Sequence, residues 1–122
     1  MMKKHSQISS AELTVMQILW EADEPLNVQA VCDRLPKGKW AYKTVGTLLI
    51  RMEEKGAVAS EKIGRTNYYA PILDKEEYTK EQTKEFISRL YQGSVKNLAV
   101  SLFKSGDMTE SDIAELRKMF DL

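Results

Sequence analysis

The segment from Ala41 to Gly56, AYKTVGTLLIRMEEKG, restricts the fold more than any other part of the chain. Its apolar residues recur at the spacing of one helix face, and its polar residues gather on the opposite face. The apolar residues are Val45, Leu48, Leu49 and Met52, and the polar ones are Lys43, Thr44, Thr47 and Arg51. Gly56 is well placed to end the helix, because glycine readily adopts the left-handed conformation found there. The pattern predicts an amphipathic helix packed on neighbouring elements.

Two further helices are expected before this segment. The first, over about residues 10 to 22, begins at Ser9 and Glu12, whose spacing is that of a capping box. Its apolar residues at helical spacing are Leu13, Met16, Leu19 and Trp20. Asn27 can cap the second helix, which ends before Pro36. Its apolar stripe consists of Val28, Val31, Cys32 and Leu35.

A β-hairpin is expected directly after the third helix. Residues 57–62 and 67–71 predict two short strands, joined by residues 63–66. Three helices followed by a hairpin is the order of a winged helix, in which the third helix is the recognition helix of a helix-turn-helix. The hairpin carries Lys62 and Arg65 near its end, where a wing would touch the DNA backbone. Tyr68 and Tyr69 must point to opposite faces, and one of them is expected in the core.

The remainder of the chain has an entirely helical pattern. Gly93 ends a first helix, Ser94 can cap a second, and Thr109 with Asp112 resembles a capping box before a third. About 50 residues are too few to bury three apolar stripes well, so a second copy of the chain is the expected partner. The expected dimer contacts are Tyr78, Phe86, Leu90, Val95, Leu98, Leu102, Ile113, Leu116 and Phe120.

We therefore expect a mainly α fold with a small β-hairpin wing. A winged helix-turn-helix domain would span residues 1–73, and a helical dimerisation domain would span residues 74–122. No apolar run approaches the roughly 20 residues that cross a bilayer, and no apolar stretch of a secretory signal follows the first lysines. The expected location is the cytoplasm, without membrane association.

Enzymatic chemistry and metal binding are not expected. The single cysteine, Cys32, excludes a disulfide framework, and its place on an apolar stripe favours a core side chain over a nucleophile or ligand. The only histidine, His5, lies close to the amino terminus. Neither a phosphate-binding glycine loop nor a metal-ligand cluster is visible, so the sequence predicts no catalytic residues, no metal and no cofactor.

The distribution of charge is more informative than its sum, which is zero. Residues 37–65 hold seven basic and three acidic residues, a net charge of +4, and residues 72–122 have a net charge of −2. A basic centre with an acidic tail is typical of a chain that meets phosphate with one part. The polar face of the third helix suits a major groove, although an ordinary solvated face has the same pattern. Gly46 is expected on the exposed side, where it costs about 1 kcal/mol of helix propensity and could permit closer approach to DNA.

Five motifs in order resemble the penicillinase-repressor family: ISSAELTVMQILW, WAYKTVGTLLIRMEEKG, KIGRTNYYAP, LYQGSVKNLAVSLF and MTESDIAELRKM. The resemblance runs nearly end to end. It implies a winged-helix repressor that dimerises through its carboxy-terminal segment, binds a palindromic operator in double-stranded DNA and represses the adjacent genes. The alternative function is a winged-helix adaptor that binds protein, which would retain DNA only weakly and without sequence preference in a gel shift.

The family pattern can be carried over residue by residue. The W-x-x-K-T motif falls on Trp40, Lys43 and Thr44, the base-facing threonine on Thr47, and the glycine-arginine of the wing on Gly64 and Arg65. We expect base contacts from Lys43, Thr44 and Thr47, and phosphate contacts from Arg51, Lys62 and Arg65.

The chain departs from the family pattern at two places. One concerns the cap of the third helix, and the other concerns the inducing signal. Ala41 stands where relatives usually carry a capping serine, a loss of about 1 kcal/mol unless Lys39 or Trp40 begins the helix. The paired C-x-C ligands of copper-responsive relatives are missing, so copper sensing is not expected.

The inducing signal stays open between a regulatory protease and a small molecule bound between helices. The Asn-Phe bond cut in antibiotic-responsive relatives corresponds to Ser101-Leu102 in this chain. Cleavage by a penicillin-receptor protease of the familiar specificity is therefore not expected.

Overall fold

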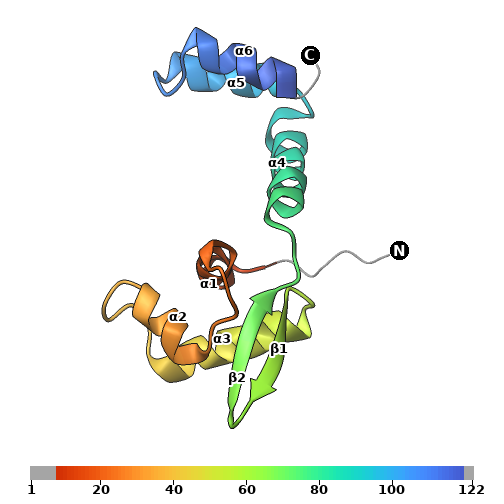
Figure 1. Ribbon diagram of the computed structural model, residues 1–122. Coiled ribbons are helices and arrows are strands. Elements are labelled where there is room, and N and C mark those ends of the chain that lie inside the picture. The colour runs from red at the N-terminus through yellow and green to blue at the C-terminus, as the bar shows by residue number, and fades with distance from the viewer. Residues whose placement is uncertain (1–7, 120–122) are drawn as a thin grey trace. The chain divides into compact units, whose positions relative to one another are not determined.

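The computed structural model describes residues 8–119, so the expectations about His5 and Phe120 lie outside the described residues. Helices and a two-stranded hairpin follow one another in the order predicted, and the expected fold class is confirmed (Figure 1). Contacts divide the chain into a unit that ends at Lys75 and a unit that begins at Glu76. Within the described residues, none of the helices combines the length and apolar character needed to cross a membrane.

The first unit begins with three helices, α1 (Ser10–Glu21), α2 (Val28–Arg34) and α3 (Tyr42–Glu54). The capping box of α1 is confirmed: the Glu12 N–H donates to Ser9 Oγ over 3.1 Å, and the Ser9 N–H donates to Glu12 Oε1 over 2.9 Å. Asn27 caps α2 by accepting from the Ala30 N–H over 2.8 Å. Local capping therefore fixes where the two helices before α3 start.

The core of this unit forms where the apolar face of α3 meets α1 and α2. All four apolar residues predicted for α3 are buried: Val45, Leu48, Leu49 and Met52. Val15, Met16 and Leu19 of α1 and Val31 of α2 are buried with them. Burial of this face leaves the polar face of α3 toward solvent.

Strands β1 (Val58–Ile63) and β2 (Thr66–Pro71) pair antiparallel, with Ser60 opposite Tyr69. The connection is the two-residue loop Gly64-Arg65, shorter than the four residues expected. Gly64 has φ +67°, and a glycine at the first loop position is typical of the type II′ turns that suit twisted strands. The strands therefore pair almost to the end of the hairpin.

Tyr69 is the tyrosine that joins the core, at 4% exposure, while Tyr68 on the opposite face is only half-buried. At the same residue the hairpin makes a backbone bridge that sequence analysis did not predict. The Leu26 N–H donates to the Tyr69 carbonyl over 2.9 Å, and the Tyr69 N–H donates to the Leu26 carbonyl over 2.7 Å. Leu26 is a single extended residue between α1 and α2, too short to give a strand pattern. The bridge ties the hairpin to the helices.

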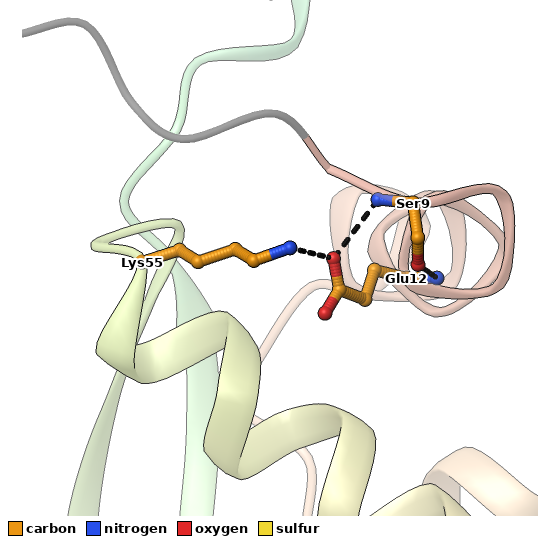
Figure 2. A network of polar contacts seen from close by, with 3 residues as sticks. All are labelled: Ser9, Glu12 and Lys55. Carbon is orange, nitrogen blue, oxygen red and sulfur yellow. Dashed lines mark hydrogen bonds and ion pairs between the residues drawn. The ribbon is translucent and has the colours of Figure 1, made fainter.

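An ion pair between the half-buried Lys55 and the buried Glu12 joins the end of α3 to the start of α1 (Figure 2). Lys55 Nζ lies 2.6 Å from Glu12 Oε1, and only 2% of the Glu12 side chain is exposed. Burial acts to raise the pKa of Glu12, but the hydrogen bonds from Lys55 and Ser9, with the charge of Lys55, outweigh it and lower this pKa below its ordinary value. Glu12 therefore serves both the helix cap and a long-range contact.

The second unit contains three helices, α4 (Lys75–Tyr91), α5 (Val95–Lys104) and α6 (Glu110–Met119). Ser94 caps α5 by accepting from the Asn97 N–H over 3.0 Å, and Thr109 and Asp112 form the reciprocal capping box expected before α6. After α4, Gln92 and Gly93 both have positive φ, and the Gly93 N–H donates to the Ile87 carbonyl. Helices α5 and α6 pack on each other.

We predict that the Glu12–Lys55 pair stabilises the folded chain in a pH-dependent way. Lys55→Met leaves a buried carboxylate without its ammonium partner and should lower the free energy of unfolding by about 1–3 kcal/mol near neutral pH. Glu12→Gln should cost less, because glutamine can still accept from the Ser9 N–H as in other capping boxes.

The pH dependence follows from the lowered pKa of Glu12 in the folded state. The stabilisation is complete above the ordinary glutamate pKa of about 4.3 and is lost as the pH falls through the lower folded pKa. Urea unfolding at about pH 7 and about pH 3 should therefore show a difference between wild type and Glu12→Gln that shrinks in acid. An equal difference at both pH values would contradict the prediction.

Candidate nucleic-acid interface

The outward face of α3 gathers the polar residues that sequence analysis assigned to base and phosphate contact. Lys43, Thr44, Thr47 and Arg51 are all exposed. Their opposite face is buried on α1 and α2, so α3 is presented to solvent as the second helix of a helix-turn-helix. Figure 1 shows α2 and α3 joined by the short turn that precedes α3.

The hydroxyl of Thr47 is already engaged within the helix. Its Oγ1–H donates to the Lys43 carbonyl over 3.1 Å. A threonine hydroxyl has a single proton to donate, so Thr47 presents only lone pairs and a methyl group to a ligand. In this arrangement Thr47 can accept a hydrogen bond or make an apolar contact.

The start of α3 is not capped by a side chain. Ala41 is the N-cap residue and makes no side-chain hydrogen bond, so the alternative that Lys39 or Trp40 begins the helix is wrong. Trp40 is half-buried just before the cap, and Lys39 Nζ lies 4.9 Å from the centre of its ring. This distance is within the range of a cation–π contact.

Gly46 does not lie on the exposed side of α3, contrary to expectation. It is half-buried beside α2, and a Cβ built at this position would lie 4.0 Å from Val28 Cγ2. The close neighbour of Gly46 is therefore α2. Residues three positions apart are neighbours on a helix surface, so Gly46 borders Lys43 on the side of α3 that faces α2.

The hairpin adds two exposed basic residues, Lys62 and Arg65, to the basic residues of α3. Its first strand is joined to α3 by a hydrogen bond in which Ser60 Oγ donates to Glu53 Oε2 over 2.8 Å. Figure 1 shows the hairpin beside α3. Of the seven basic residues counted between positions 37 and 65, Lys55 is held by Glu12 and the other six are exposed. The basic character predicted from the sequence thus lies on the outer surface of α3, its preceding turn and the hairpin.

Sequence analysis missed two exposed side chains of α3. Tyr42, the first residue of the helix, is 59% exposed, and Ile50 is 52% exposed. Both are apolar or largely apolar, so they were not considered among the polar candidates. A helical wheel would have placed Ile50 with the polar row, because it lies seven residues after Lys43 and three after Thr47.

The chemistry of the described residues offers no metal centre. No group of three histidine, cysteine, aspartate or glutamate side chains gathers between residues 8 and 119. Cys32 is partly buried on α2, and both burial and the charge of Asp33 raise the pKa of its thiol. A raised pKa disfavours the thiolate that nucleophilic or metal chemistry requires.

Comparison with known proteins agrees with this arrangement. Residues 8–121 match the family model described as penicillinase repressor. The penicillinase repressor of Bacillus licheniformis is 32% identical over 121 residues, which cover 98% of this chain and 94% of the relative. The methicillin resistance regulatory protein MecI of Staphylococcus aureus is 27% identical over 119 residues, covering 97% and 96% respectively.

Two solved structures of DNA-binding repressors resemble part of this chain. The solution structure of the DNA binding domain of the repressor BlaI superposes with a TM-score of 0.54 and 41% identity, covering 63% of this chain and 94% of that domain. The monomeric form of Bacillus licheniformis BlaI in complex with the blaP half-operator superposes with a TM-score of 0.52, with the same identity and coverage. These likenesses confirm the winged-helix fold.

We predict that Ala41→Ser stabilises α3. A serine at the N-cap can accept from a backbone N–H in the first turn, which Ala41 leaves without a side-chain partner, and should raise the free energy of unfolding by about 1 kcal/mol. The measurement is urea unfolding of both proteins, with Ala41→Gly as a control that should differ from serine by only a few tenths of a kcal/mol. No gain from serine would mean that the first turn of α3 is already satisfied by other groups.

Proposed function

Because the chain belongs to the penicillinase repressor family of winged-helix transcriptional repressors, we propose that it binds a palindromic operator as a homodimer and represses the adjacent genes. The family consists of regulators and not of enzymes, in keeping with the chemistry of the site. The observation that carries the proposal is the exposed row of Lys43, Thr44 and Thr47 on a helix whose other face is fully packed. The action takes place in the cytoplasm, where a bacterial operator lies.

The exposed residues divide into two roles. Lys43, Thr44 and Thr47 occupy the first half of α3, the part of a recognition helix that contacts base edges in the major groove. Arg51 near the end of α3, with Lys62 and Arg65 on the hairpin, contacts phosphates on either side. A relative solved in complex with a half-operator is 41% identical over an aligned region that covers 63% of this chain, which supports DNA as the partner of the winged helix.

Dimerisation is assigned to the second unit, because its helices leave large apolar side chains uncovered. Phe86 and Leu90 of α4 are 40% and 55% exposed, and Val100 and Phe103 of α5 are also exposed. Of the residues predicted to contact the partner, Tyr78, Leu98, Leu102, Ile113 and Leu116 are half-buried. Val95 is buried within the chain, so it supports the packing of α5 and offers a partner little surface. Covering this apolar surface is the driving force for pairing two copies.

Loss of the dimer is one of the two routes to derepression that stay open, beside a small molecule bound between helices. Two tethered DNA-binding units gain affinity from effective concentration, and a regulatory protease that separates them removes this gain. Ser101 and Leu102 lie inside α5, where the Ser105 N–H donates to the Ser101 carbonyl. Because proteases bind extended chains, cleavage in α5 requires this helix to unwind first.

We predict different effects on DNA binding for the two roles. A duplex is first enriched from a random pool. On this duplex Thr47→Ala should lose about 1–3 kcal/mol of binding free energy, whereas its binding to random DNA should change little. Arg65→Ala should weaken both duplexes alike and reduce the salt dependence, because a phosphate contact releases counterions. Thr83→Ala is the matched control, since Thr83 Oγ1 makes the same type of bond to the Thr79 carbonyl in α4. If Thr47→Ala and Arg65→Ala behave alike, the division of roles is wrong.

We also predict a dimer at micromolar concentration that depends on exposed apolar residues of α4. Leu90→Glu should give a folded monomer in analytical ultracentrifugation, because a charge on this surface opposes its burial. Lys84→Glu, another exposed position of α4, should leave the dimer intact. A chain that ends after Lys75 should also be a folded monomer, since it keeps Leu73, whose carbonyl accepts from Trp20 Nε1 over 2.8 Å. A full-length wild-type monomer would overturn this part of the proposal.

A further inference from the structure

Ile50 is an apolar residue on the exposed side of α3, so the pattern of polar residues does not identify it. Its side chain is 52% exposed, although the four buried apolar residues of α3 all lie on the opposite face. A single exposed isoleucine is ordinary on a protein surface. This one, however, follows Lys43 by seven residues and Thr47 by three, so the three side chains form one row along the outward face of α3.

The neighbour of Ile50 in this row also presents an apolar group. Thr47 donates its hydroxyl proton to the Lys43 carbonyl over 3.1 Å, which leaves its methyl group and lone pairs for a ligand. The centre of the row therefore consists of the threonine methyl and the branched side chain of Ile50, with Lys43 before them. Glu54 continues the row one turn further, where its carboxylate repels DNA phosphate.

Among the four base pairs, only those with thymine present an apolar group in the major groove, the C5-methyl. An aliphatic side chain held against the polar edge of another base would leave hydrogen-bonding groups desolvated and without partners. We infer that Ile50, together with the methyl of Thr47, selects thymine in the operator by contacting its C5-methyl group. The inference rests on the proposed DNA binding, extends the base-contacting part of α3 from Thr47 to Ile50, and adds the base and the atom recognised there.

The test replaces thymine by deoxyuridine, which removes the C5-methyl and leaves the hydrogen-bonding groups of the base unchanged. A duplex is first enriched from a random pool with the full-length wild-type protein, and each of its thymines is then replaced in turn. At one or two positions, loss of the methyl should weaken wild-type binding about fourfold, equivalent to about 0.8 kcal/mol for one buried methyl group.

Ile50→Ala should bind the enriched duplex more weakly than wild type and lose this fourfold sensitivity to deoxyuridine. Because Ile50 is half-exposed and alanine favours helix, the variant should keep its helical circular dichroism. Ile72→Ala is the matched control: Ile72 is 58% exposed and lies outside α3, so its variant should keep both the affinity and the sensitivity.

Three results would overturn the inference. The first is wild-type binding that tolerates deoxyuridine at every position, and the second is an Ile50→Ala variant as sensitive as wild type. Both leave sequence-specific DNA binding, and hence the proposed function, in place. The third is that no duplex is enriched at all, which would instead refute the proposed function and with it the role of Ile50 at a base; the side chain would then belong to a protein contact.

Discussion

The burial of one face of α3 is the constraint on which the rest of the first unit depends. Val45, Leu48, Leu49 and Met52 are fixed against α1 and α2, so the helix cannot rotate without exposing them. The direction of Lys43 and Thr47 toward solvent follows from this packing and not from any property of their own. The direction of the exposed polar face of α3 is thus set by burial of the apolar face opposite it. The packed core beneath holds this direction rigidly.

Polar contacts then position the parts that the core does not fix. The Glu12–Lys55 pair joins the first turn of α1 to the residue after α3, and the Ser60–Glu53 bond joins the hairpin to the last turn of α3. The bridge between Leu26 and Tyr69 holds the hairpin from the side of the helices. The first two of these contacts lie at the carboxyl end of α3, and none of the three involves its amino-terminal half. Together they join the hairpin and α3 in one framework.

The second unit follows the same physical rule with a different outcome. Side chains of Ser94 and Thr109 cap α5 and α6, yet helices with few neighbouring elements bury little of their apolar surface. Phe86, Leu90 and Phe103 remain exposed within the chain. In the proposed dimer this exposed apolar surface would be covered, and two weak half-site contacts would become one strong contact.

The sequence by itself determined the helices, their caps, the hairpin and the polar face of α3, because each depends on residues within a few positions of one another. Ser9 with Glu12 and Asn27 fixed helix starts in this local way. Only the tertiary structure decided that Tyr69 and not Tyr68 enters the core, that Gly46 lies beside α2, and that Lys55 is paired with Glu12. The helical spacing of Ile50 from Lys43 and Thr47 already placed it on the outward side of α3, and the tertiary structure adds that its side chain is 52% exposed. Those outcomes depend on partners distant in sequence, which only packing and long-range polar contacts bring together.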